Sequence, residues 1–225
     1  MLLSLNDVSF SYRTKYQTVN AVKNVSCEFE AGKLYAVVGK SGSGKTTLLS
    51  LMAGLARPDG GAISVDGKDL LSLDPDAYRR DTVSIIYQNF NLFPLLTVLE
   101  NVMYPLGLNK TPKQEALKIA VEVIKKVGLD ESYCKRLPSM LSGGEQQRVA
   151  IARALATGAQ TILADEPTGN LDSENTENIV GLLTSLAHGE NRCVIVVTHD
   201  QNVADAADTV YRMDSGRLTE EARES

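Results

Sequence analysis

The sequence lacks the features that mark secreted, metal-binding and membrane-spanning proteins. Its three cysteines, Cys27, Cys134 and Cys193, are far apart and are not combined with histidines at metal-binding spacing. We therefore expect free thiols in a reducing compartment. No apolar run approaches the roughly 18 residues of a membrane-spanning helix, and the first residues lack the basic segment and apolar core of a signal peptide. We expect a soluble protein whose contact with any membrane depends on a partner.

Acidic residues moderately outnumber basic ones. Lysine and arginine number 23 against 28 aspartate and glutamate residues, which gives a net charge of −5. Because nucleic-acid-binding proteins favour basic faces, we expect no nucleic-acid partner, although a locally positive phosphate site is not excluded. The chain has 225 residues, 43% of them hydrophobic, so it can bury a sizeable core. We expect a single domain over residues 1–225.

Short apolar segments alternate with helical patterns, which predicts an α/β fold. The runs at 34–38, 83–87, 161–164 and 193–198 are typical of strands buried on both faces of a parallel sheet. Apolar and polar residues alternate in the first 30 residues and at 63–65, before an Asp66–Gly67 turn. This alternation predicts a small N-terminal antiparallel sheet beside the mostly parallel core.

The middle of the chain, residues 89–157, is predicted to form a helical subdomain. One of its helices is expected to have Thr111 as N-cap, Pro112 in the first helical position and Gln114 at capping-box spacing, and to end at Gly128. The polar tail, residues 217–225, is expected to fray.

A glycine-rich segment between an apolar strand and a helix matches the phosphate-binding pattern G-x-x-x-x-G-K-[ST] in full. Its residues are Gly39, Lys40, Ser41, Gly42, Ser43, Gly44, Lys45 and Thr46. Glycines allow backbone N–H groups to converge on phosphate oxygens at a helix N-terminus. We predict that Lys45 contacts the β- and γ-phosphates and that Thr46 ligates Mg²⁺, with Thr47 also in the nucleotide site. The alternative, a glycine-rich turn with an incidental lysine, requires a chance match of about one in a hundred.

Two carboxylates end the predicted strand at 161–164. Asp165 lies where open α/β sheets bind ligands and is predicted to hold Mg²⁺. Glu166 is predicted to act as general base toward the attacking water. An Asp-Glu-Pro sequence after a strand is by itself a common turn, so this interpretation depends on the phosphate-binding segment.

The segment Leu141–Gln147, Leu-Ser-Gly-Gly-Glu-Gln-Gln, precedes a strong helical pattern. Ser142 and Glu145 have capping-box spacing. A cap does not explain Gly143 and Gly144, since glycine in a helix costs about 1 kcal/mol relative to alanine. A helix start with bare backbone suits a second anion site.

With this segment the chain resembles the ABC ATPase family along nearly its whole length. The resemblance implies an ATPase with ATP and Mg²⁺ as cofactors. Tyr12 resembles the aromatic residue that stacks on adenine, Gln88 the glutamine that meets Mg²⁺ or the attacking water, and His199 the histidine at the γ-phosphate. A lone tyrosine or histidine is more often structural, and Tyr16 is a weaker rival of Tyr12.

The resemblance also implies a homodimer in the ATP-bound state, with two subunits arranged head to tail. The phosphate-binding segment of one subunit then faces the Leu141–Gln147 segment of the other. The residues expected to act across the dimer are Ser142, Gly143, Gly144 and, from the segment Gly169–Asp172, Asp172.

The stretch Ala164–Ser173 resembles the lipoprotein-releasing, macrolide-exporting and cell-division ABC ATPases. This implies ATP-driven export of a peptide, lipid, lipoprotein or drug on the inner face of the cell membrane. A regulatory switch without cargo is the alternative. A membrane permease is expected to dock near Gln88–Leu96, where Phe90 and Phe93 could equally pack under the helical subdomain.

Overall fold

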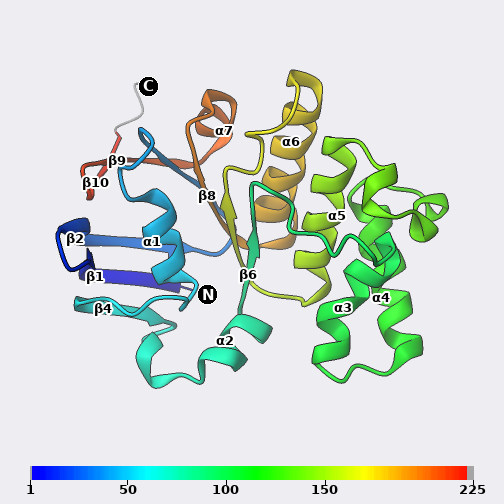
Figure 1. Ribbon diagram of the computed structural model, residues 1–225, viewed down its shortest axis with the longest axis horizontal. Coiled ribbons are helices and arrows are strands. Elements are labelled where there is room, and N and C mark those ends of the chain that lie inside the picture. Colours follow the sequence, from blue (N-terminus) through cyan, green and yellow to red (C-terminus); the bar gives the residue numbers. More distant parts are fainter. Residues whose placement is uncertain (1, 222–225) are drawn as a thin grey trace.

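The uninterrupted apolar segments of the sequence form the centre of a six-stranded sheet in the computed structural model, which describes residues 2–221 (Figure 1). Five strands are parallel and β10 is antiparallel to its neighbour β9. In spatial order the strands are β10 (Arg217–Glu220), β9 (Thr209–Asp214), β3 (Leu34–Val38), β8 (Cys193–Thr198), β7 (Thr161–Asp165) and β6 (Val83–Ile86). The predicted α/β class with a mostly parallel sheet is confirmed.

The register of the parallel strands brings their carboxyl ends to one edge. Val38 is opposite Thr198, Asp165 is opposite Val197, and Ile86 is opposite Ala164. The segments that follow β3, β6, β7 and β8 therefore leave the sheet side by side, which is where ligands bind in open α/β sheets.

The alternating segments form a separate antiparallel sheet, as predicted. Its order is β2 (Thr18–Glu30), β1 (Leu2–Arg13), β4 (Gly60–Val65) and β5 (Lys68–Asp69). The predicted turn between β4 and β5 has positive φ at both Asp66 and Gly67, the conformation that suits a two-residue hairpin loop.

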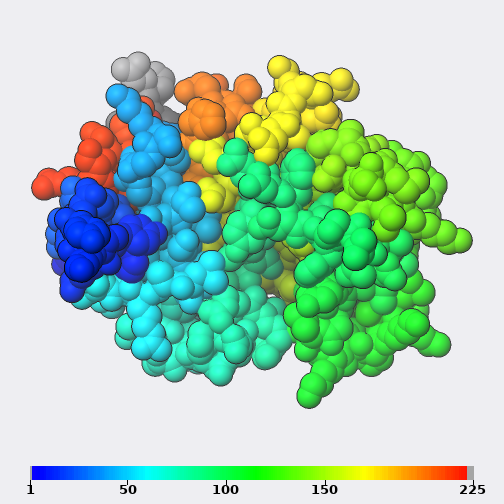
Figure 2. All heavy atoms as spheres, viewed as in Figure 1, coloured from blue at the N-terminus to red at the C-terminus, as the bar shows by residue number. Residues whose placement is uncertain are grey.

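Seven α-helices and three short 3₁₀ helices complete the described part of the chain. The α-helices are α1 (Lys45–Met52), α2 (Pro75–Asp81), α3 (Val98–Leu108), α4 (Lys113–Lys126), α5 (Gly143–Ala156), α6 (Ser173–Glu190) and α7 (Gln201–Ala206). The 3₁₀ helices are Leu70–Ser72, Glu131–Lys135 and Pro138–Met140. Helices α3, α4 and α5 lie together at one end of the molecule, and the antiparallel sheet lies at the other (Figures 1 and 2). Among residues 2–221, no helix is both long and apolar enough to cross a bilayer.

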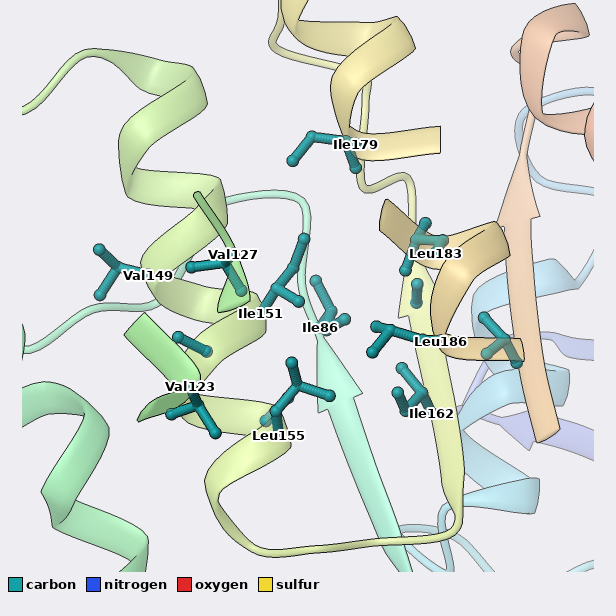
Figure 3. Close-up of a cluster of buried hydrophobic side chains, with 14 of the residues drawn as sticks. Ile86, Val123, Val127, Val149, Ile151, Leu155, Ile162, Ile179, Leu183 and Leu186 are labelled. Carbon is teal, nitrogen blue, oxygen red and sulfur yellow. The ribbon is translucent and has the colours of Figure 1, made fainter. Parts of the chain in front are cut away.

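Two apolar clusters cover the two faces of the parallel sheet. One joins β3, β7 and β8 to α1 and the antiparallel sheet. The other joins the sheet to α3–α6. Figure 3 shows Ile151 and Leu155 of α5 pointing toward Ile86 of β6 and Ile162 of β7. The apolar packing thus holds α5 against β6 and β7.

Two local expectations are wrong. Pro112 is extended at ψ 137°, so α4 starts one residue later, at Lys113, and Pro112 is an N-cap without a side-chain hydrogen bond. Thr111 therefore does not cap this helix. The tail was expected to fray from residue 217, but Arg217–Glu220 forms β10, paired with β9 through the turn at residues 215–216. Residues 222–225 lie outside the described part of the chain.

Candidate active site

A cavity of about 910 Å³ opens at the carboxyl ends of β3, β7 and β8. The phosphate-binding segment, residues 39–47, is called the P-loop below. Its residues 40–47 form one wall of the cavity. The remaining lining residues come from strand ends, from the antiparallel sheet and from the β9–β10 turn. They are Tyr12, Val19, Asn20, Ala21, Lys23, Gln88, Asp165, Glu166, His199, Ser215 and Gly216.

The P-loop depends on glycine at positions where the backbone packs against other strands. A Cβ atom on Gly39 would lie 2.2 Å from the carbonyl oxygen of Met213, and one on Gly44 would lie 2.2 Å from that of Ala21. Gly44 also has φ 110° and is the N-cap of α1, a conformation that favours glycine. The unpaired N–H groups at the start of α1 therefore adjoin the cavity, as an anion site requires.

Lys45 brings a buried positive charge to this wall, with 7% of its surface exposed. Its Nζ donates to the carbonyl oxygens of Gly39 at 2.7 Å and Lys40 at 3.2 Å, and lies 3.9 Å from Glu166 Oε1. Because the ammonium group is held by the loop itself, it is already placed to receive an anion.

Thr46 and Asp165 provide oxygen ligands at the next strand end. The Thr46 hydroxyl donates to Asp165 Oδ1 at 3.1 Å. Burial raises the pKa of Asp165, and the hydrogen bond from Thr46 partly offsets this effect. Within the described residues, no three His, Cys, Asp or Glu side chains gather into a metal-binding group. The donor set fits Mg²⁺, which proteins commonly bind through one or two carboxylates together with substrate phosphates and water.

Glu166 and His199 are in direct contact. Glu166 has φ 47° and its Oε2 accepts hydrogen bonds from Thr198 Oγ1 at 3.1 Å and from the His199 backbone N–H at 3.2 Å. The His199 ring Nδ1 lies 2.9 Å from the same oxygen. Each residue was predicted from its own motif, but no sequence pattern indicated the pairing. The arrangement orients both side chains at the cavity.

Gln88 lines the cavity where the segments after β6 and β7 meet. The Asn170 side-chain amide donates to the Gln88 carbonyl at 3.1 Å. A Cβ on Gly169 would lie 3.1 Å from Gln88 Nε2. The Gln88 segment and Gly169–Asp172 are therefore in contact within one chain.

Tyr12 lines the cavity, and the residue is half exposed, at 51%. Its hydroxyl is 3.2 Å from Thr47 Oγ1, and its ring meets Phe10 edge-on at 5.0 Å. Tyr16 is 90% exposed and does not line the cavity. Tyr12, rather than Tyr16, is thus available to stack on a bound base.

The structure does not bring Ser142, Gly143, Gly144 or Asp172 into the lining of the cavity. Ser142 and Glu145 form the predicted capping box at the start of α5, and Asp172 caps α6 by accepting from the Asn175 N–H at 2.9 Å. These residues form helix starts outside their own chain's cavity.

Gly143 and Gly144 have different surroundings. A Cβ on Gly144 would lie 2.2 Å from Asn175 Oδ1, whereas one on Gly143 would meet nothing closer than 3.7 Å. Packing inside the chain therefore explains a glycine at position 144 but not at position 143.

Two residues that support the site were missed at the sequence level. Arg153 donates to the carbonyls of Phe90 at 2.9 Å and Asn91 at 2.6 Å, both residues with positive φ, and burial lowers its pKa. Asn101, fully buried, bonds both the N–H and the carbonyl of Phe93. A Thr97-x-x-Glu100 capping box precedes Asn101 and would have located its helix.

Comparison with known proteins decides the family. Residues 22–169, more than half of the chain, match the family described as ABC transporter. The chain belongs to this family. It is 40% identical to the ABC transporter ATP-binding protein MJ0796 of Methanocaldococcus jannaschii, over 99% of this chain and 97% of the relative. Membership confirms the predicted ATPase activity and the predicted cofactors, ATP and the Mg²⁺ that is standard in the family.

Other relatives have different transport roles in their names. The chain is 40% identical to the lipoprotein-releasing system protein LolD 1 of Rhodopirellula baltica, over 99% of this chain and 98% of the relative. It is also 40% identical to the methionine import protein MetN 1 of Bacillus thuringiensis subsp. konkukian, of which it spans 66%. Identity alone does not separate export from import.

Solved structures of MJ0796 agree with the fold. A dimeric structure has a TM-score of 0.90, with 38% identity and 99% coverage of both chains. A second dimeric structure, of a post-hydrolysis state bound to ADP and Pi, has a TM-score of 0.89 at the same identity and coverage.

Proposed function

We propose that this ABC ATPase hydrolyses ATP between two copies of itself arranged head to tail. The observation that carries the proposal is the placement of Ser142 and Gly143 outside the cavity of their own chain, with Gly143 unexplained by packing within that chain. A second copy would present this bare helix start to the phosphates bound on the P-loop. The dimeric structures of MJ0796 support this arrangement.

In this proposal, each cavity residue has a distinct role. Tyr12 stacks on the base, and the P-loop N–H groups and Lys45 bind the phosphates. Thr46 and Asp165, with Gln88, hold Mg²⁺, which supplies charge neutralisation on the phosphates when bound. Glu166 accepts a proton from the attacking water, and its bond to His199 keeps the carboxylate oriented.

The role of Glu166 is tested with Glu166→Gln. The amide keeps the size of the side chain but cannot accept the proton, so turnover is expected to fall by roughly 100-fold or more. MgATP should still bind and convert the variant to a dimer, which light scattering measures. The control is Glu177→Gln on the exposed surface of α6. Normal turnover in Glu166→Gln would refute the general-base role.

We further propose that the site drives a membrane permease on the inner face of the cell membrane. The segment Gln88–Leu96 supports docking there. Leu92 packs on the buried core, while Leu95 is 88% exposed. Phe93 contacts Tyr104 at 4.4 Å between ring centroids, and both line a shallow cavity of about 270 Å³. We propose that Leu95 contacts the permease and that Leu92 belongs to the core of the chain.

Leu95→Glu tests the docking surface. The charged side chain should abolish co-purification of the chain with its permease without lowering the ATPase rate of the isolated chain. Leu55→Glu, at a leucine 51% exposed and outside this segment, is the control and should keep the permease. Retention of the permease by Leu95→Glu would contradict docking at this surface.

For cargo, we propose export of a peptide, lipid, lipoprotein or drug, supported by the stretch Ala164–Ser173 and by the likeness to LolD 1. The methionine import relatives favour import as the alternative. Purification of the complex with its permease in lipid, followed by ATPase assays with candidate cargo, separates these outcomes. An ATPase rate that responds to a sensor or cell-wall enzyme instead of cargo would indicate the regulatory switch.

A further inference from the structure

The turn that joins β9 to β10 contains a glycine that has no role in the proposed reaction. Ser215 has φ 48° and Gly216 has φ 87°, as in a two-residue hairpin loop. Both residues line the cavity, although they lie more than 165 positions after the P-loop. Gly216 is buried and Ser215 is exposed.

The backbone of Gly216 connects the P-loop to the antiparallel sheet. Its N–H donates to the carbonyl of Ser43 at 2.9 Å, and its carbonyl accepts from the N–H of Lys23 at 2.8 Å. Ser43 is the P-loop residue just before Gly44 and Lys45. One residue of the hairpin turn therefore bonds both to the P-loop and to β2.

The same three elements approach each other too closely for side chains. A Cβ on Gly216 would lie 3.0 Å from the carbonyl oxygen of Ala21 in β2, and a Cβ on Gly44 would lie 2.2 Å from that same oxygen. A Cβ on Gly39 would lie 2.2 Å from the carbonyl oxygen of Met213 in β9. The P-loop is thus packed against both β2 and the β9–β10 hairpin.

The bond to Ser43 fixes the direction of a P-loop N–H group. The Ser43 carbonyl and the Gly44 N–H belong to one planar peptide group and, in the trans form, point in opposite directions. Because the carbonyl is held by Gly216, the Gly44 N–H points away from the turn. Phosphate binding by a loop of this kind depends on such N–H groups being aligned before the anion arrives.

We propose that the Ser215–Gly216 turn is a positioning element of the nucleotide site, and that Gly216 holds the P-loop in its phosphate-binding conformation. The inference rests on the proposed role of the P-loop in binding phosphates. It assigns the C-terminal hairpin to the ATPase site instead of to the fold alone.

The test compares Gly216→Ala with a matched glycine in another hairpin. Gly67 also occupies the second position of a two-residue turn, with φ 77°, but a Cβ there would meet nothing within 4 Å. Both substitutions force alanine into the left-handed region and should lower the melting temperature, Gly216→Ala by more because its Cβ also meets the Ala21 carbonyl. Only Gly216→Ala should weaken MgADP binding, by roughly 10- to 100-fold as expected for a misplaced binding group, measured by calorimetry on folded protein.

Gly216→Asn separates backbone strain from close approach. Asparagine tolerates the left-handed region better than alanine, but its Cβ still meets Ala21, so MgADP binding should again weaken. This variant carries the test if Gly216→Ala does not fold. Unchanged MgADP affinity in folded Gly216 variants, or an equal loss in Gly67→Ala, would overturn the proposal. Failure of the unaltered chain to bind MgADP would instead overturn the proposed role of the P-loop.

Discussion

At the scale of single residues, Asn101 holds the segment that follows Gln88 in place. Its amide nitrogen donates to the carbonyls of Phe93, Leu96 and Thr97, and its oxygen accepts from the Phe93 N–H. The side chain is fully buried, and its loss would remove the hydrogen-bond partner of the Phe93 N–H and of the Leu96 carbonyl and leave a cavity.

Asn101→Ala is therefore expected to lower the free energy of unfolding by about 2–4 kcal/mol, measured by urea denaturation. Asn178→Ala, at an exposed asparagine of α6, is the control and should change it by less than about 0.5 kcal/mol. A small effect at Asn101 would show that the segment does not depend on this amide.

Two aspartates are expected to affect stability in opposite directions as the pH changes. Burial raises the pKa of Asp165, so the folded state binds its proton more tightly than the unfolded state. Its ionisation therefore lowers stability as the pH rises through its titration range. The Asn175 backbone N–H, with the Asn175 side chain, lowers the pKa of Asp172. That contribution is present above the ordinary aspartate pKa and is lost as the pH falls.

Asp165→Asn should accordingly stabilise the nucleotide-free protein at neutral pH, while Asp172→Asn should destabilise it. Melting temperatures between pH 3 and 8 measure both differences, which should vanish at the acid end. A destabilised Asp165→Asn protein at neutral pH would mean that its hydrogen bond with Thr46 outweighs the cost of burying the charge.

At the scale of elements, the contact between α5 and α6 depends on Gly144. Helix propensity alone predicts that Gly144→Ala stabilises α5 by about 1 kcal/mol. Because the new Cβ would lie 2.2 Å from Asn175 Oδ1, we expect a net destabilisation of about 1–3 kcal/mol, as for overpacking. The double variant with Asn175→Ala should regain most of this loss.

Gly143→Ala is the matched control, because its Cβ would have only ordinary contacts. It should not be destabilised in urea denaturation. If its ATPase rate nevertheless falls, the bare backbone at position 143 is required for contact with the second copy of the chain or its bound nucleotide. Equal destabilisation of both single variants would contradict the difference in their packing.

Elements with two buried faces could be predicted from the sequence. The apolar run 193–198 coincides with β8 at both ends, since burial on both faces leaves no polar position inside such a strand. The start of α4 and the strand β10 were not predicted correctly. The first depends on the extended ψ of Pro112, and the second on pairing such as Leu218 with Met213.

The same distinction holds for the site. Short patterns located the P-loop, Asp165 and Glu166, because their spacing reflects local backbone geometry. Arg153 donates to the carbonyl of Phe90, more than 60 residues away in the chain. Gly216 donates to the carbonyl of Ser43, more than 170 residues away. No local pattern records such a bond, so only the three-dimensional structure could reveal them.

At the scale of the whole molecule, the head-to-tail dimer makes a prediction about mixtures of inactive chains. Lys45→Ala removes a P-loop charge. Ser142→Asp keeps a good N-cap for α5 but places a negative charge where the partner's phosphates are proposed to lie. Each variant alone is expected to be inactive. In a mixed dimer, Lys45 of one chain and Ser142 of the other complete one of the two sites.

Random pairing makes half of the dimers mixed, each with one intact site, so an equimolar mixture should recover about a quarter of the wild-type rate if the sites work independently. A mixture of Lys45→Ala with Glu166→Gln is the control. Both of those residues line the cavity of the same chain, so no mixed dimer contains an intact site. The control mixture should stay inactive. If the sites work independently and the first mixture also stays inactive while its chains still dimerise with MgATP, Ser142 acts within its own chain and the head-to-tail site is wrong.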